Sequence, residues 1–193
     1  MISRSEKGDN MNLEYQTKHL DLRILTASYA KAVCQFYQKN RLAFEEVEPT
    51  RVPNFYTEEF HASNLSAEYN EFLHGRYLRL FLFEKDAPTQ IIGSICFNSF
   101  RSGCFMSCIV GYKMDGDYTN KGYMSEALSY SIHQIIKYEY NMHRIEAMVL
   151  PSNKASIRIL EKLGFQNEGI AREYAHLNGV WRDHFRYSML VYQ

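Results

Sequence analysis

The 193-residue sequence predicts a single α/β domain. Segments in which apolar and polar residues alternate, as they do in strands with one buried face, are interspersed with segments of helical spacing. Three strand-like segments near the middle of the chain are joined by short polar links, which favours an antiparallel meander. The predicted order is a strand, two helices, three strands, a helix, a strand, a helix and two final strands, which is typical of one sheet covered by helices.

The first part of the domain is predicted to hold one strand and two helices. Residues 19–26 alternate in the manner of a strand, and residues 27–40 carry apolar side chains at helical spacing. Two prolines then interrupt the pattern in the segment "EPTRVPNF". Thr57 is the expected N-cap of a second helix, which runs toward Gly75 and has glutamates in its first turn.

The middle of the chain changes to strands. The segments at 76–84, 90–100 and 104–114 are the three predicted strands of the meander. An apolar stripe predicts a helix over 123–140, and the next strand is expected at 143–151, where a proline ends it.

The last part of the domain is predicted to be a short helix followed by a hairpin. Asn153 is expected to open the helix, which ends at Leu163 with Gly164 as its C-terminal cap. The dipeptide Asn178-Gly179 lies between two strand-like segments, and it favours a tight turn whose residues have positive φ.

Composition limits the classes of function. The 22 basic and 22 acidic residues balance, so no overall charge attracts the chain to nucleic acid or to an anionic membrane. No apolar run is long enough to span a bilayer. Residues 1–18 lack an apolar signal-peptide core, so we expect a loose polar leader before a domain at 19–193. We therefore expect a cytoplasmic protein.

The four cysteines do not predict a metal site. No pair has CxxC spacing, and the pair Cys104 and Cys108 has no matching Cys or His pair downstream. We expect all four, including Cys34 and Cys96, to be buried reduced thiols. Cys104 and Cys108 are expected to point the same way along one strand.

The stretch "DYTNKGYMSEA", which begins at residue 117, has two interpretations. A tight polar turn that leads into a helix presents unpaired N–H groups at the positive end of the helix dipole, and such an arrangement binds phosphate. Gly122 would let a ligand approach the backbone, and Lys121 would add a positive charge. The alternative is an ordinary helix start capped by Thr119 or Asn120. The stretch matches neither the P-loop nor the GxGxxG pattern.

A second segment, "NKASIRILEKLGF", follows the next predicted strand. Asn153 and Ser156 lie one helical turn apart and therefore on the same side of the helix. Both residues could instead have only local structural roles, with Asn153 as a helix cap and Ser156 bonded to nearby backbone.

The two segments, in this order, resemble the acetyl-coenzyme A binding core of the GNAT family of N-acetyltransferases. The segments "IIGSICFNSF", "HRIEAMVLPSNKAS" and "LGFQNEGIAREYAHLNGVWRDH" also resemble the ribosomal-protein alanine N-acetyltransferases of the RimJ type. The resemblance covers roughly 19–190. It implies a GNAT fold, which is a mixed, mostly antiparallel and twisted sheet flanked by helices.

The resemblance also implies a set of residues that bind acetyl-CoA without any metal. Its pyrophosphate would lie on the turn at Thr119, Asn120, Lys121, Gly122, Tyr123 and Met124, and its pantetheine arm would contact Asn153 and Ser156. In the family, the strand before the turn supplies backbone donors to the oxyanion. This role points to Tyr112, Lys113 and Met114.

The sequence departs from the family pattern at several positions. Thr119 replaces a Gln or Arg, and Met124 replaces a Gly or Ala that leaves room for the phosphates. Leu160 stands where many relatives have a tyrosine general acid. Ser156 is the expected donor to the leaving sulfur, and its alternative role is to position the substrate. Some relatives have a glutamate base at the position of Ala175, and we expect Glu173, two residues earlier, to be the base.

The acceptor amine is left open between several classes. Aromatic residues and glutamates between 37 and 60 could line a groove for a basic peptide or a cationic drug, or they could be ordinary core and solvated surface. The resemblance favours the N-terminal α-amine of a ribosomal protein, attacked directly in a ternary complex. The alternatives are a polyamine, an aminoglycoside or an amino acid, and a sensor that binds acetyl-CoA without turnover. Dimers are common in the family, so a homodimer is one expected assembly.

Overall fold

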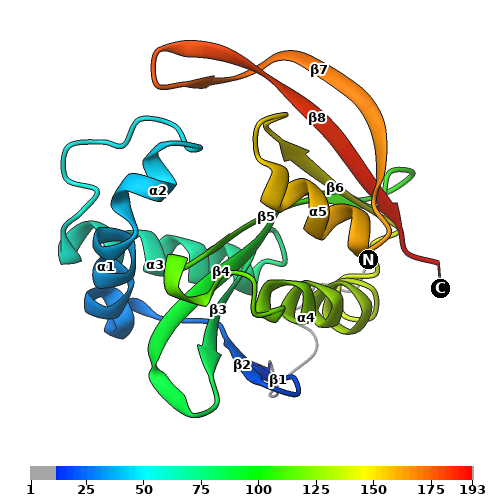
Figure 1. Ribbon diagram of the computed structural model, residues 1–193. Helices are drawn as coiled ribbons and strands as arrows, with labels where there is room; N and C mark the ends of the chain where they lie inside the picture. Colours follow the sequence, from blue (N-terminus) through cyan, green and yellow to red (C-terminus); the bar gives the residue numbers. More distant parts are fainter. Residues whose placement is uncertain (1–11, 193) are drawn as a thin grey trace.

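The computed structural model describes residues 12–192, which form one eight-stranded sheet flanked by helices (Figure 1). The strand order is β1-β2-β3-β4-β5-β6-β8-β7. Only β5 and β6 pair in parallel, and the other neighbours are antiparallel. The expected mixed, mostly antiparallel sheet in a single α/β domain is therefore confirmed.

The strands and helices follow the chain in a simple succession. The strands are β1 (Glu14–Gln16), β2 (Leu20–Arg23), β3 (Leu78–Glu84), β4 (Ala87–Arg101), β5 (Ser107–Met114), β6 (Arg144–Val149), β7 (Gln166–Leu177) and β8 (Val180–Leu190). The α-helices are α1 (Ala30–Lys39), α2 (Arg41–Glu45), α3 (Glu58–Leu73), α4 (Tyr123–Tyr130) and α5 (Lys154–Lys162). The 3₁₀ helices η2 (Ala27–Tyr29) and η3 (Gly116–Tyr118) and the π-helix η4 (Ser131–Ile136) complete the fold.

Two apolar cores lie on opposite faces of the sheet. Alternation along β3 places Leu80 and Leu82 in the core beneath α4 and α5, while Phe81 and Phe83 lie in the core beneath α1 and α3. This division explains why β3 is apolar on both faces. The helices on either side of the sheet then frame the space above the middle of β5 (Figure 1).

Most predicted elements are confirmed, including three local signals. The Thr57 hydroxyl accepts a hydrogen bond from the backbone N–H of Phe60 and caps α3. Gly164 has a φ of 91° after α5. Asn178 and Gly179 have φ values of 50° and 82° and join β7 to β8.

The predicted helix at 123–140 differs from the observed one. After Tyr130 the α-helix changes to the π-helix η4, and the buried Ser131 hydroxyl donates to the Ala127 carbonyl at 2.7 Å. A serine that bonds back to the preceding turn competes with the regular helical ladder, which is consistent with this local change. The short helix α2 was not predicted.

The leader and the cysteines also differ from expectation. Residues 14–16 form β1, so the prediction of a loose segment is wrong there, while residues 1–11 lie outside the described part of the chain. Cys104 is exposed and precedes β5, whereas Cys108 is buried within it, so the two do not share a strand face. All four thiols are free.

Candidate active site

The turn before α4 leaves backbone donors free at the helix start. Asn120 and Gly122 both have left-handed φ values, 61° and 83°, and Gly122 is the N-cap with no side-chain cap. The first helical bond runs from the Glu126 N–H to the Gly122 carbonyl at 3.0 Å. The N–H groups of the first turn therefore have no partner within the helix. The Thr119 hydroxyl donates to Gly116 at 2.9 Å instead, so neither Thr119 nor Asn120 caps α4 as the alternative interpretation required.

The side chains around this turn leave its approach open. A Cβ at Gly122 would meet no atom within 4 Å. The Met124 side chain is 5% exposed and packs into the core. It therefore does not crowd the approach, although its replacement of a small residue had suggested that it would. Tyr123 donates a hydrogen bond to Glu84, and the Lys121 ammonium lies 4.4 Å from the Tyr118 ring.

Two acidic residues next to this turn share an ion pair with one lysine of a helix on the other face of the sheet. The Lys39 ammonium lies 2.7 Å from the Asp115 carboxylate and 2.6 Å from the Asp117 carboxylate. The hydrogen bonds that Lys39 donates to Asp115 and Asp117 raise the pKa of Lys39 above its ordinary value. This shared ion pair offsets part of the negative charge near Gly122 and ties the turn to α1.

Strands β5 and β6 separate soon after they pair. Their parallel ladder joins Ser107–Ile109 to Arg144–Glu146 and ends there, although both strands continue. Beyond this point lies a cavity of about 250 Å³ lined by the diverging strands and α5, which we call the β5–β6 cavity. Such an opening exposes backbone groups that a regular sheet would pair.

The direction of these backbone groups follows from the neighbouring strand. The Asp115 N–H donates to the Ile92 carbonyl of β4 at 2.8 Å, in register with the rest of the β4–β5 ladder. Alternation then directs the Lys113 N–H toward β4 as well, and those of Tyr112 and Met114 toward the opening. Of the three predicted oxyanion donors, Tyr112 and Met114 therefore have suitable backbone directions, and Lys113 does not.

Asn153, Ser156 and Tyr112 meet on one wall of the β5–β6 cavity. The Asn153 side chain accepts from the Ser156 N–H at 3.0 Å and caps α5, so its local role is confirmed. The Tyr112 and Ser156 hydroxyl oxygens lie 2.7 Å apart. Burial raises the pKa of Tyr112 to about 12 and keeps the phenol protonated. Leu160 is buried beside them and supplies no acid.

The predicted base, Glu173, does not line the β5–β6 cavity. It is exposed, has a φ of 47° where β7 slips relative to β8, and its N–H donates to the Asp183 carboxylate at 2.8 Å. The prediction relied on strand alternation with Ala175, but the register shift between Ala171 and Ala175 interrupts that alternation.

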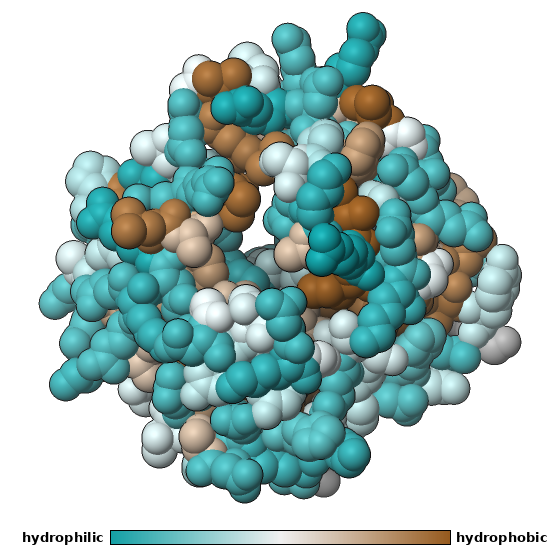
Figure 2. Space-filling model, in the orientation of Figure 1, coloured by the Kyte–Doolittle hydropathy of each residue, from teal (hydrophilic) through white to brown (hydrophobic). Residues whose placement is uncertain are grey.

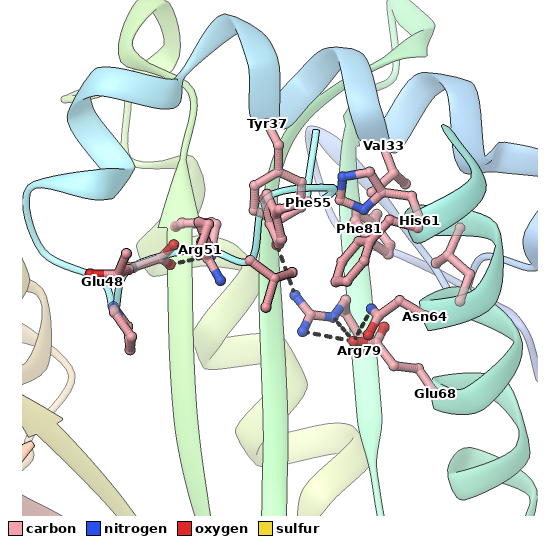
Figure 3. A pocket seen from close by; sticks show the side chains of 16 residues that line it. Val33, Tyr37, Glu48, Arg51, Phe55, His61, Asn64, Glu68, Arg79 and Phe81 are labelled. Carbon is pink, nitrogen blue, oxygen red and sulfur yellow. Dashed lines mark hydrogen bonds and ion pairs between the residues drawn. The ribbon is translucent and has the colours of Figure 1, made fainter. Parts of the chain in front are cut away.

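A second cavity of about 370 Å³ lies between α1, α3 and the segment that follows α2 (Figure 3). We call it the α1–α3 cavity. Tyr37, Phe55 and Phe60 line it as the sequence suggested, whereas Phe44 is buried in the core and Tyr56 bonds to Glu45. The aromatic walls are therefore partly cavity and partly ordinary core.

Charged side chains are arranged in two groups around this cavity. Glu68 accepts hydrogen bonds from Asn64 and from the guanidinium of Arg79, at 2.9 Å and 3.1 Å (Figure 3). Glu48 forms ion pairs with Arg51 and Lys113. Of the glutamates between residues 37 and 60, only Glu48 lines this cavity, and it is paired with cations, whereas Glu46, Glu58 and Glu59 are exposed as the alternative interpretation expected.

The two cavities adjoin at three charged residues. Glu48, Arg79 and Lys113 line both of them. Burial lowers the pKa of Lys113 to about 8, although the nearby Tyr37 opposes this shift. The tip of the β7–β8 hairpin reaches the end of α2, where the Asn178 amide donates to the Glu45 carbonyl at 2.8 Å. The space-filling view shows a hollow near the middle of this face of the molecule (Figure 2).

The α1–α3 cavity is lined by a buried histidine, His61, which makes the stability of the fold depend on pH. It is 2% exposed and stacks on Tyr37, and within the described chain its Nε2 has no hydrogen-bond partner. Burial lowers the pKa of His61 to about 4, so the folded protein keeps this ring neutral at pH 5 while the unfolded chain protonates it.

Lowering the pH from 7 to 5 is therefore expected to reduce the free energy of unfolding by about 2 kcal/mol through His61. Stability from this group is complete above pH 6.5 and is lost as the pH falls toward 4. Urea denaturation of the natural protein and of His61→Phe at both pH values measures the contribution of His61 to the free energy of unfolding. An unchanged pH dependence in His61→Phe would contradict the assignment.

Comparison with known proteins identifies the family. Residues 19–166 match the family model described as an acetyltransferase (GNAT) domain. The chain belongs to the GNAT family. The two separate sequence signals, at Gly122 and at Asn153, thus lie within one GNAT core.

Relatives of this GNAT domain share most of its length. The chain is 32% identical over 169 residues to the [ribosomal protein uS5]-alanine N-acetyltransferase of Escherichia coli (strain K12), which covers 87% of this chain and 86% of the relative. The structure of the ribosomal-protein-S5-alanine acetyltransferase from Vibrio fischeri is 29% identical, with a TM-score of 0.87 and coverage of 93% and 97%. RimJ of Mycobacterium smegmatis in complex with CoA-disulfide is 25% identical, with a TM-score of 0.82 and coverage of 89% and 81%.

This GNAT protein is an N-acetyltransferase that takes the acetyl group from acetyl-CoA. The open backbone at Gly122 fits a pyrophosphate, and the β5–β6 cavity fits the arm that carries the thioester. Among residues 12–192 no cluster of three or more His, Cys, Asp or Glu side chains could hold a metal ion. No helix in the same range is long and apolar enough to cross a membrane.

Several side chains at the junction were not predicted from the sequence as functional. Glu48 appeared there only as one of several glutamates, Tyr112 and Lys113 were chosen for their backbone, and Arg79 was not considered. The available signal was weak. Lys113 and Arg79 are charged residues within predicted strands of an apolar meander, where a charge usually needs a partner.

Proposed function

We propose that the chain transfers the acetyl group of acetyl-CoA to the N-terminal α-amine of a protein, with a ribosomal protein as the substrate class. The observation that carries this proposal is the meeting of two cavities at Glu48, Arg79 and Lys113. The thioester would lie on the β5–β6 side and the acceptor on the α1–α3 side. We place this activity in the cytoplasm, where ribosomal proteins are made.

The chemistry is consistent with direct attack in a ternary complex. The N–H groups of Tyr112 and Met114 would face the carbonyl oxygen as negative charge develops on it, and each such donor contributes a few kcal/mol in known cases. The hydroxyls of Tyr112 and Ser156 would face the leaving sulfur. Ser156 keeps its predicted role as the donor to sulfur, with Tyr112 orienting and polarising it.

Two observations favour a chain end over a cationic small molecule. An α-amine has a pKa of about 8, against about 10.4 for a lysine, so it reaches the neutral form more easily. Three cations, Arg51, Arg79 and Lys113, and two carboxylates, Glu48 and Glu68, line the α1–α3 cavity. This excess of positive charge opposes a polyamine or an aminoglycoside more than a peptide with a single amine.

A panel of acceptors tests the proposal through the release of coenzyme A thiol. Peptides that start with alanine or serine are expected to be turned over at least about tenfold more efficiently than spermidine, an aminoglycoside or a free amino acid. The same alanine peptide with an acetylated N-terminus is the matched control and should release no thiol above background. Preferential turnover of a small amine would overturn the proposed acceptor class and leave the GNAT activity standing.

A further inference from the structure

The Glu48 side chain lies where the two cavities adjoin. This residue follows α2 and is half-buried, and its side chain lines both the β5–β6 cavity and the α1–α3 cavity. Arg79 and Lys113 share this position, so within residues 12–192 Glu48 is the one carboxylate that lines both. An amine that passes from its binding cavity to the thioester must approach this carboxylate.

Two cations hold the Glu48 carboxylate in place. Lys113 donates to one oxygen and Arg51 to the other. The Lys113 ammonium lies 4.9 Å from the Tyr37 ring centroid, and the Arg51 guanidinium lies 4.2 Å from that of Phe55. Each carboxylate oxygen has two lone pairs, so both oxygens retain capacity to accept another hydrogen bond.

We propose that Glu48 is the catalytic residue that binds the incoming ammonium of the acceptor and takes its proton. The inference deepens the proposed function, on which it rests for the class of acceptor. Glu48 thereby replaces Glu173, which the fold leaves on the exposed hairpin. The neighbouring cations assist because they favour the neutral form of an amine placed beside them.

The proposed step balances in atoms and charge. The acceptor ammonium gives one proton to the Glu48 carboxylate, which later passes it to solvent. The amine nitrogen then forms a bond to the thioester carbonyl carbon, and the carbon–sulfur bond breaks. The second proton on nitrogen goes to the departing thiolate, directly or through the Ser156 hydroxyl. The products are the amide, coenzyme A thiol and one proton in solution.

The surroundings of Glu48 determine how the step depends on pH. Lys113 has a pKa lowered to about 8 by burial, so it stays largely protonated at neutral pH. The charged and titratable groups that line the two cavities around Glu48 are Arg51 on its own segment, Tyr37 on α1, His61 and Glu68 on α3, Arg79 on β3, Cys96 on β4, Tyr112 and Lys113 on β5 and His184 on β8.

The test is Glu48→Gln, which keeps the shape and removes the charge. The acceptor is the best amine of the panel above, whether peptide or small molecule, so a change of acceptor class does not affect the result. We expect kcat/KM for the acceptor to fall by about 10²–10⁴, the range of general acid–base catalysis. The Kd for acetyl-CoA should stay within about twofold. Glu46→Gln, an exposed neighbour that lines neither cavity, should change neither quantity.

A second acceptor separates proton transfer from a structural role. The same acceptor is used with its amine replaced by a hydrazide, which is already neutral at pH 7 and needs no base. For this acceptor the loss in Glu48→Gln should shrink to less than about tenfold. With the ordinary amine, kcat/KM of Glu48→Gln should rise tenfold per pH unit below the amine pKa of about 8, whereas the natural enzyme is flat there.

Glu48→Asp is the control for the possibility that Glu48→Gln loses activity because it misfolds. It keeps a carboxylate and is expected to recover at least about tenfold of the activity that Glu48→Gln loses, at a similar melting temperature. Activity of Glu48→Gln within threefold of the natural enzyme would overturn the proposal. Equal losses on amine and hydrazide would also overturn it, because a purely structural role predicts that result.

Discussion

Replacement of Glu68 by alanine is expected to lower the free energy of unfolding by roughly 3 kcal/mol, the largest stability effect among our predictions. Glu68 accepts hydrogen bonds from Asn64, Tyr77 and Arg79, and its side chain is only 15% exposed. The alanine would leave the Arg79 guanidinium, itself 17% exposed, without its anion. Removing one partner of such a pair costs more than the pair contributes, because the remaining charge is uncompensated.

Urea denaturation measures this effect, and two variants control it. Glu71→Ala on the same helix removes an exposed pair with Arg76 and should shift the unfolding midpoint little. The double variant Glu68→Ala with Arg79→Met removes both charges and should recover part of the loss. A Glu68→Ala protein as stable as the Glu71→Ala control would show that the pair is solvated and would refute this description of the cavity wall.

Replacement of Gly122 by valine is expected to raise the Kd for acetyl-CoA by about 10- to 100-fold. Gly122 has a φ of 83°, and its missing side chain leaves the space around it open within 4 Å. A β-branched side chain would strain this conformation and stand in front of the free N–H groups of α4. The loss of one or two charge-assisted hydrogen bonds to phosphate accounts for this size of effect.

Gly103→Val is the matched control for backbone strain. Gly103 has a φ of 69° in the turn between β4 and β5, and a Cβ there would also meet nothing within 4 Å. Both variants should lose about 1–2 kcal/mol of stability for a left-handed residue with a side chain. Only Gly122→Val should weaken the binding of acetyl-CoA, as measured by calorimetric titration. If the two variants bound acetyl-CoA with equal affinity, the assignment of the phosphate site to this turn would be wrong.

Local signals in the sequence predicted the local backbone structure around Gly122, Asn153 and Asn178 well. Gly122 and Asn153 were found because a tight turn and a helix cap each depend on residues that are adjacent in the chain. Asn178-Gly179 predicted the hairpin for the same reason. The strand order was predictable to the extent that short links between strands force antiparallel neighbours.

The junction of the cavities was not predictable in this way. Glu48, Arg79 and Lys113 come from three separate segments and meet only because the segment after α2 packs beside β3 and β5. Glu173 was chosen from a regular alternation that a register shift interrupts, and single sequences do not reveal such a shift. The 2.7 Å contact between Tyr112 and Ser156 likewise joins residues 44 positions apart.

The most direct test of the central claim is tandem mass spectrometry of one peptide that carries both a free α-amine and a lysine. The peptide starts with alanine and is incubated with the enzyme and acetyl-CoA at pH 7, beside a sample without enzyme. The account predicts one added acetyl group, located by the fragment ions on the N-terminal alanine. Acetylation of the lysine instead, or no acetylation by a protein that acetyl-CoA stabilises against heat, would contradict it.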